Sequence, residues 1–255
     1  MGGTSARTKP ADEEIWPEPA GRGGVGKAVV AVLVVLVLVA AGAAAWFLFR
    51  PSDGAAGEET AQGPVPDVYV PQSPGQDAGK VASRDGDIRP FTKGELFDGM
   101  KKVTYRKYTF TLKTAEVTED CAAAVWGELL PQTLARGKCT QVARAGYLSD
   151  DGQYAGVFVA VNVVDQRAAQ QVLNSLDPAL NGGFVRAPEI EGAPDFGSGF
   201  TAAYSQAIGH YVIMSWVGRA DGEPPAAMNE LIDTSLAVQK PEEFAWGRIV
   251  LLDPR

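Results

Sequence analysis

The sequence predicts an α+β domain with a mainly antiparallel sheet, preceded by one transmembrane helix. Three observations lead to this prediction. Segments rich in valine, tyrosine and phenylalanine predict strands, and two pairs of them are joined by short turns that contain glycine. Segments with the apolar spacing of a helix follow each strand pair. Near the N-terminus, an apolar run without any charge is long enough to cross a bilayer.

The apolar run AVVAVLVVLVLVAAGAAAWFLF, residues 28–49, predicts the transmembrane helix. A helix of this length spans about 33 Å, slightly more than the hydrocarbon core of a membrane. Arg22 and Lys27 precede the run, whereas only Arg50 follows it closely. Positive charge favours the cytoplasm, so we expect a single-pass cell-membrane protein with a cytoplasmic N-terminus. The alternative is a cleavable signal peptide, for which the small residues AGAAA at 41–45 offer a cleavage site.

The rest of the chain divides by composition. Residues 1–27 are rich in glycine, proline and mixed charges, which predicts a disordered cytoplasmic tail. Residues 50–90 form a linker rich in proline and glycine. Residues 91–255 are expected to form the extracytoplasmic α+β domain.

The elements of this domain are expected in a regular order. A strand at 103–112 is followed by a helix at 118–130, which opens on acidic residues. Strands at 139–148 and 153–164 flank the turn SDDG and lead to a helix at 165–176, which Asp165 can cap. Strands at 200–207 and 210–220 lead to a helix at 224–237 that opens on two prolines. A last strand is expected at 244–252.

The two strand pairs also indicate an internal ββα repeat. Each pair is a strand–turn–strand unit that leads to an aspartate and then a helix, and the two units lie about 57 residues apart. The matched positions are Tyr147 with Tyr204, Gly152 with Gly209, and Tyr154 with Tyr211. The alternative is a chance similarity of two hairpins.

The only two cysteines, Cys121 and Cys139, are predicted to form a structural disulfide. An extracytoplasmic compartment permits such a bond. A zinc site would need four ligands, and a redox pair is usually as closely spaced as C-x-x-C. One straight helix over residues 121–136 would be about 24 Å long, whereas disulfide-bonded Cα atoms lie within about 7 Å of each other. We therefore expect the helix to break at Pro131.

The segments VWGELL and GKCTQVARAGYLSDDG, with the two cysteines and the following hairpin, carry a resemblance. Behind an N-terminal anchor and a proline-rich linker, they resemble a group of uncharacterised actinobacterial membrane-anchored proteins with an extracytoplasmic domain. The resemblance covers about residues 115–235 and implies no activity. A weaker similarity to extracytoplasmic sensor domains of bacterial receptor kinases supports only a binding role.

Both faces of the predicted sheet are apolar, as in a sheet that is covered on both sides. We assign Val157, Val159, Met214 and Trp216 to the core that packs against helices. The opposite face is interpreted as a partner or self-association surface, because an uncovered apolar patch marks an interaction site. Its residues are Tyr154, Phe158, Tyr211 and Ile213. The alternative is that the end of the linker or residues 244–252 fold over this face.

The composition and the missing motifs limit the function. The net charge of −8 argues against a nucleic-acid partner, because phosphate binding needs a basic surface. The chain has no Walker A loop, no G-x-S-x-G and no H-E-x-x-H, and His210 is its single histidine. We expect His210 to be a surface residue of a turn, and we predict no catalytic residue, metal ligand or cofactor.

The sequence therefore favours a binding or interaction module over an enzyme. The expected role is that of a sensor or an accessory subunit of a cell-envelope assembly, with an envelope protein or polymer as partner. The alternative is a cell-envelope hydrolase that uses His210, with Ser198 and an acidic residue as its partners.

Overall fold

The structure is a computed structural model that describes residues 63–72 and 79–252. The expected tail, the apolar run at 28–49, and residues 50–62 and 73–78 of the expected linker lie outside the described residues. Within the described ranges, no helix is both long enough and apolar enough to cross a membrane.

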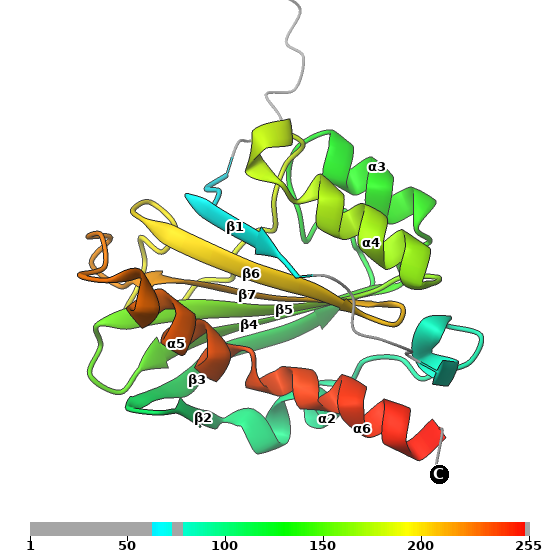
Figure 1. The fold of residues 1–255 in the computed structure, drawn as a ribbon, viewed down its shortest axis with the longest axis horizontal. Helices are drawn as coiled ribbons and strands as arrows, with labels where there is room; N and C mark the ends of the chain where they lie inside the picture. Colours follow the sequence, from blue (N-terminus) through cyan, green and yellow to red (C-terminus); the bar gives the residue numbers. More distant parts are fainter. Residues whose placement is uncertain (1–62, 73–78, 253–255) are drawn as a thin grey trace, which may run out of the picture. The chain divides into compact units, whose positions relative to one another are not determined.

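One seven-stranded sheet forms the centre of the domain, with the order β1-β6-β7-β5-β4-β3-β2. All neighbouring strands are antiparallel except β1 and β6, which are parallel. The α+β class and the mainly antiparallel sheet are thus confirmed (Figure 1). The strands are β1 (Val68–Pro71), β2 (Lys102–Tyr105), β3 (Tyr108–Thr118), β4 (Gln141–Ser149), β5 (Tyr154–Asn162), β6 (Thr201–Ile208) and β7 (Tyr211–Arg219).

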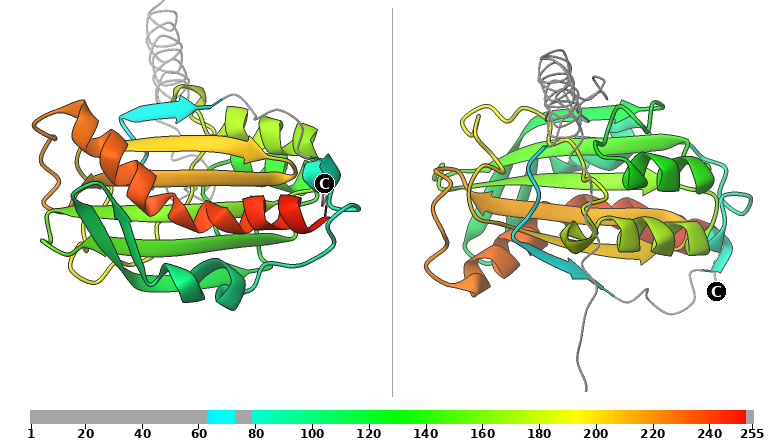
Figure 2. Two further views of the ribbon diagram at one scale, coloured as in Figure 1. Left: turned by 60° about the horizontal axis from the view of Figure 1, so that its bottom comes forward. Right: turned by 90° about the horizontal axis from the view of Figure 1, so that it is seen from above.

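Helices cover both faces of the sheet (Figures 1 and 2). On the first face lie α3 (Leu129–Arg136) and α4 (Gln166–Ser175), and on the second face lie α2 (Lys93–Phe97), α5 (Met228–Val238) and α6 (Glu243–Leu252). Four 3-10 turns complete the described elements: η1 (Gly79–Ala82), η2 (Asp98–Met100), η3 (Pro178–Leu180) and η4 (Lys240–Glu242).

The two faces form two separate hydrophobic cores, because successive side chains of a strand point to opposite sides. Val157, Val159, Met214 and Trp216 lie in the first core together with side chains of α3 and α4, as predicted. The second core lies between the sheet and the helices α2, α5 and α6. A sheet covered in this way needs apolar residues on both faces, which explains the nearly continuous apolar composition of β5 and β7.

The prediction of a helix at 118–130 is wrong. Strand β3 continues to Thr118, a turn follows, and helix α3 begins only at Leu129. Pro131 therefore lies in the first turn of α3 rather than at a helix break, and this position tolerates proline because the first N–H groups of a helix have no partner within it. The eight residues of α3 make a short helix, so the chain can return to the vicinity of Cys121.

Four further expectations are corrected. Residues 244–252 belong to helix α6 and are not a strand. The fold extends into the expected linker, because β1 pairs with β6. The strand expected at 103–112 is divided into β2 and β3 by a tight turn at Arg106, whose φ is 51°. Helix α5 begins at Met228 rather than at residue 224.

The two expected units occur as β4–β5–α4 and β6–β7–α5, and they meet where β5 pairs with β7. Gly152 and Gly209 both adopt positive φ in the hairpin turns, at 70° and 58°. The helices differ, however: α4 packs on the first face and α5 on the second. The two units therefore place their helices on opposite faces of the sheet.

Candidate functional site

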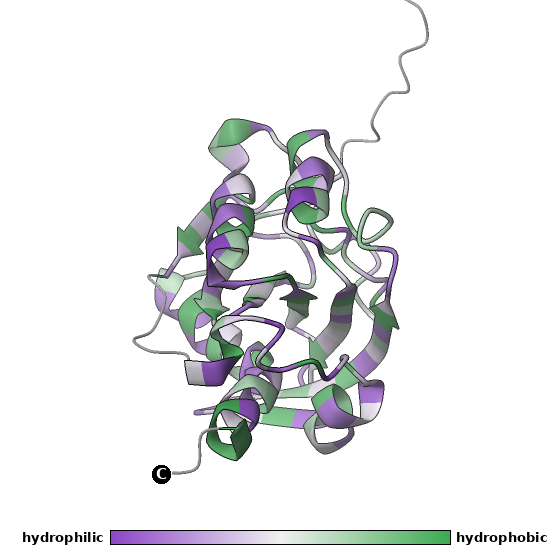
Figure 3. Cartoon of the chain, turned by 90° about the vertical axis from the view of Figure 1, so that its right-hand side faces the viewer, coloured by the Kyte–Doolittle hydropathy of each residue, from purple (hydrophilic) through white to green (hydrophobic). Residues whose placement is uncertain are grey.

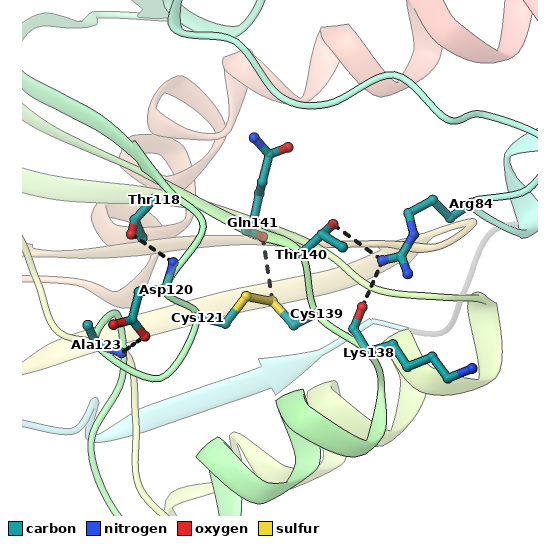
Figure 4. Close-up of a disulfide and its surroundings, with 9 residues drawn as sticks. All are labelled: Arg84, Thr118, Asp120, Cys121, Ala123, Lys138, Cys139, Thr140 and Gln141. Atoms are coloured by element: carbon teal, nitrogen blue, oxygen red, sulfur yellow. Dashed lines mark hydrogen bonds between the residues drawn. A yellow bond between two sulfur atoms is a disulfide. The ribbon is translucent and has the colours of Figure 1, made fainter.

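The disulfide between Cys121 and Cys139 is formed, with the Cα atoms 6.3 Å apart. It joins the turn after β3 to the segment between α3 and β4. Figure 4 shows how the turn before it is held: the Asp120 side chain accepts a hydrogen bond from the Ala123 N–H at 3.0 Å. The bond therefore fixes two loops at one end of the sheet.

A segment far away in the sequence reaches the same place. Arg84 Nη1 donates to the carbonyl oxygen of Lys138 at 2.7 Å and contacts Thr140 Oγ1 at 3.3 Å (Figure 4). The Arg84 backbone N–H donates to the carbonyl oxygen of Val164 at 2.9 Å. Arg84 thus connects the segment after η1 to the disulfide loop and to the end of β5. The sequence places Arg84 in the expected linker, so the prediction did not include this contact.

Between these segments lies an open hollow that we call the disulfide cleft, with a volume of about 640 Å³. Its size falls within the range of clefts that bind small ligands. Its lining combines one guanidinium, two carboxylates, two amides, a hydroxyl and apolar side chains: Arg84, Asp85, Ile88, Pro90, Glu119, Thr140, Gln141 and Asn162.

Asn162 is the most unusual residue of the cleft. It ends β5, between Gln141 of β4 and Tyr211 of β7, and it is only 2% exposed. Its Oδ1 is buried and has no hydrogen-bond partner. Gln141 differs, because its side chain accepts from the Phe91 N–H at 2.6 Å and donates to the Phe91 carbonyl at 3.3 Å. A buried polar group without a partner costs about 1–3 kcal/mol, so Asn162 is a candidate ligand contact.

Charge in the cleft is mixed. The Arg84 guanidinium brings a positive charge to the lining and is held there by its Nη1 contacts with Lys138 and Thr140. Asp85 and Glu119 are exposed carboxylates on the same lining. Ile88 is 81% exposed, which is unusual for an aliphatic side chain. The cleft can therefore offer hydrogen bonds, both signs of charge and an apolar contact to a polar ligand.

A buried ionic network holds the cleft wall that contains Ile88 and Pro90. Arg248 of α6 is 1% exposed, and its Nε donates to Glu95 Oε1 at 2.8 Å. Arg248 Nη2 donates to the Pro90 carbonyl at 2.9 Å, and Nη1 donates to Tyr211 Oη at 2.8 Å. A planar guanidinium with five donors can satisfy several acceptors at once. This one residue therefore ties α6 to α2, β7 and the cleft wall.

Asp87 completes this network from beneath the same wall. It accepts hydrogen bonds from Arg89 Nε at 2.7 Å and from Tyr211 Oη at 2.8 Å. Burial alone would raise the pKa of Asp87, but the hydrogen bonds from Arg89 and Tyr211 outweigh it and lower the pKa to about 2. Asp87 therefore stays ionised, and its charge is balanced by Arg248, whose Nη1 lies 3.5 Å from Asp87 Oδ2.

His210 is completely buried, so its expected surface position is wrong. Its Nδ1 lies 2.7 Å from the carbonyl oxygen of Val81, and its Nε2 has no partner. The physical reason is that η1 folds over the β6–β7 turn. Burial lowers the pKa of His210 to about 4, so the ring is neutral at pH 7. Ser198 precedes β6 at the other end of the hairpin, so these two residues do not form a catalytic pair.

The predicted interaction face is buried, which contradicts its assignment to a partner. Phe158, Tyr211 and Ile213 are 0% exposed and Tyr154 is 4% exposed. Tyr154 Oη donates to Glu230 of α5 at 2.8 Å, and Phe158 packs edge-on against Phe97 with ring centroids 6.1 Å apart. The alternative prediction, that residues 244–252 fold over this face, is correct in part. These residues do cover the face, but as helix α6 and together with α2 and α5.

Sequence reasoning missed the cleft, although two signals were present. Asn162 interrupts the apolar run VFVAVNVV, and Arg248 interrupts FAWGRIVLL. A polar residue within an apolar run needs a partner when it is buried. Arg84 gave no signal, because only the fold brings it to the disulfide.

In the described part of the chain, no group of three or more histidine, cysteine, aspartate or glutamate side chains is arranged to hold a metal ion. Comparison with protein-family models gave no match, and neither curated proteins nor solved structures matched the chain.

Proposed function

We propose that the chain is a membrane-anchored extracytoplasmic binding module and that its ligand occupies the disulfide cleft. In this role it acts as a sensor or an accessory subunit of a cell-envelope assembly. The apolar run at 28–49 supports the anchor, and the asymmetry of its flanking charges supports a cytoplasmic N-terminus. The disulfide supports an oxidising compartment for the domain.

The observation that carries the binding role is the buried, unpartnered amide oxygen of Asn162 in the cleft lining. A purely structural asparagine at the end of a buried strand would be hydrogen-bonded. An acceptor without a partner stabilises nothing in the free domain, but it gains a full hydrogen bond when a ligand donor arrives. Arg84 adds charge-assisted hydrogen bonds, which are stronger than neutral ones.

The Asn162→Leu variant separates a binding role from a structural one. Leucine has a similar volume and no polar atoms, so it removes the unsatisfied group. We expect the variant to be at least as stable as the wild type, because the desolvation penalty disappears. If Asn162 serves the fold instead, Asn162→Leu will lower the urea midpoint of the full chain.

Binding itself is tested by photo-crosslinking in intact cells. A photoreactive phenylalanine analogue replaces Ile88, which lines the cleft, and a matched control replaces Leu180, which is 55% exposed and lies on η3. We expect an adduct of defined mass from position 88 alone, and its loss when Asn162→Leu is added. Equal labelling from both positions, or an adduct that survives Asn162→Leu, would contradict the proposed site.

The topology is tested separately on wall-stripped cells that express the chain with a tag at each end. Added protease should remove the C-terminal tag and leave the N-terminal tag protected. A protected C-terminal tag would place the domain inside the cell and would refute the proposed localisation.

A further inference from the structure

Two neighbouring helices expose an unusual number of large apolar side chains. They include more than half of the large apolar side chains that are exposed in the described ranges. Three of them repeat every four residues along α5, and three lie on α6, where Val250 is 67% and Leu251 is 71% exposed. The α5–α6 apolar surface consists of Met228, Ile232, Leu236, Trp246, Val250 and Leu251.

Helix α6 is not built like an ordinary surface helix. Its sequence EFAWGRIVLL is apolar on all sides except for Glu243 and Arg248. Its inner side places Phe244 and Ala245 in the second core, and Arg248 is used by the buried network. A helix that is apolar all round is normally buried on all sides. The outer side of α6 therefore lacks the cover that its composition predicts.

The two helices present this surface together. They follow each other along the second face of the sheet, with η4 between them (Figure 2). Figure 3 shows strongly hydrophobic ribbon at the end of α6, beside the C-terminal label. Exposed apolar side chains gathered on two neighbouring helices mark contact with a protein or with a membrane.

A basic hairpin lies beside α5. Arg106 at the β2–β3 turn forms an ion pair of 3.2 Å with Asp233 of α5, which shows that the hairpin and the helix are adjacent. Lys102 is paired with Asp150 at 2.8 Å. Lys101 and Lys107 are both exposed and form no ion pair with a described carboxylate. The hairpin thus adds two lysines without a carboxylate partner to the margin of the apolar surface.

The two lysines and the apolar side chains together favour an anionic bilayer as the occupant. A bilayer offers hydrocarbon for the apolar side chains, an interfacial layer suited to Trp246, and negative headgroups for the lysines.

The predicted anchor would keep the domain within tether reach of a bilayer. Thirteen residues, 50–62, lie between Phe49, the end of the apolar run, and Gly63, where the described chain begins. Such a segment reaches at most about 50 Å and has a root-mean-square span of about 21 Å. Weak docking suffices under these conditions, because a tether replaces a bimolecular encounter by an intramolecular one.

We propose that the α5–α6 apolar surface docks the domain onto an anionic lipid bilayer, with Lys101 and Lys107 contacting the headgroups. This inference rests on the proposed membrane anchor. In this orientation α5 and α6, which cover the second face of the sheet, lie against the lipid.

The test uses the full chain in nanodiscs that hold a single copy, made from phosphatidylcholine with phosphatidylglycerol and with spin-labelled lipid. Because the native cysteines are bonded to each other, one added cysteine can carry an environment-sensitive fluorophore. We expect the label in Val250→Cys to emit at shorter wavelength and to be quenched by the spin-labelled lipid. The label in the control Leu180→Cys should keep its emission.

The lysines are tested against a matched pair of exposed basic residues on the other face. Lys101→Gln with Lys107→Gln should lower the ratio of docked to free domain by about 30-fold, since each lysine near an anionic surface contributes about 1 kcal/mol. Lys138→Gln with Arg167→Gln changes the net charge equally and should leave the ratio unchanged. Equal effects of both pairs would overturn the assigned orientation.

The remaining outcomes are also decisive. Quenching at neither position, or at both, overturns the proposal. A shift at position 250 without quenching by the lipid means that protein covers the surface, which overturns the bilayer as occupant. If the chain does not enter the discs, the proposed anchor fails, and the labelled chain is then mixed with preformed vesicles of the same composition. Quenching at position 250 alone still supports docking there, and its absence overturns it.

Discussion

His210 gives the sharpest test of the packing at the end of the sheet, because it is the only histidine of the chain and is completely buried. Burial lowers its pKa from 6.5 to about 4, and the contact with the Val81 carbonyl offsets only part of this effect. Asp87 favours the charged ring, whereas Arg248 and Arg84 oppose it. The folded chain therefore holds a neutral histidine over a pH range in which the unfolded chain binds a proton.

The sign and the size of the effect follow from this difference. A group whose pKa is lowered by folding stabilises the fold fully above its unfolded pKa, and this stability is lost as the pH falls toward the folded pKa. For His210 the window runs from 6.5 down to about 4. At about 1.36 kcal/mol per pKa unit, the loss between pH 7 and pH 4 is about 3 kcal/mol.

The assay is urea denaturation of the full chain at pH 7 and pH 4, for the wild type and for His210→Gln. Glutamine keeps a donor for the Val81 carbonyl but does not titrate. Other groups, including Glu242 with its raised pKa, titrate in both proteins and cancel in the difference. We expect the wild type to lose about 3 kcal/mol more than the variant, or about 1–3 M in urea midpoint. Equal losses would refute the buried, neutral histidine.

Three other predictions concern the disulfide and the second core. Peptide mass mapping without reduction should find Cys121 joined to Cys139, and Cys139→Ser should cost about 2–5 kcal/mol. Free thiols in protein taken from the envelope would contradict the bond. Arg248→Met should cost about 3–5 kcal/mol in urea denaturation, because the buried Asp87 loses part of its balancing charge and the carbonyls of Arg89 and Pro90 lose a donor, whereas Arg167→Met at an exposed position of α4 should change stability by less than about 0.5 kcal/mol. Phe158→Asp should abolish the cooperative unfolding transition, since a buried unpaired charge is too costly. A well-folded Phe158→Asp domain would contradict the burial of this face.

The parts of the fold that sequence reasoning found are those decided locally. The hairpins around Gly152 and Gly209 combine a turn glycine with flanking β-branched residues. Helix α4 begins after Asp165, whose side chain accepts from the Ala168 N–H at 2.8 Å. In both cases the signal lies within a few residues of the element that it specifies.

The parts that were missed depend on distant partners. Strand β1 forms only because β6 offers it a free edge, and no local pattern in PDVYVP distinguishes it from a linker. Residues 244–252 are apolar on all sides, and a short apolar run of this kind fits a buried strand or a buried helix equally well. In the folded chain this segment is helix α6, and the ion pair of Arg248 with Glu95 ties it to α2. That contact lies far away in the sequence, so no local pattern reveals it.

The candidate site follows the same division. Asn162 is visible in the sequence as one polar residue in an apolar strand, but its lack of a partner is known only from the fold. Arg84 reaches the disulfide loop across more than fifty residues of sequence. A cleft built from such distant segments has no local motif.

The lengths of two connections explain why each face of the sheet has its own helices. After β5 only Val163, Val164 and Asp165 precede α4, so that helix stays on the nearer face. After β7 the eight residues 220–227, with Gly222 and two prolines, carry the chain around the sheet end before α5 begins on the other face. A sheet covered on both sides leaves no strand face for a partner. The two surfaces proposed above lie instead at the sheet end, where the disulfide cleft is, and on the outer sides of α5 and α6.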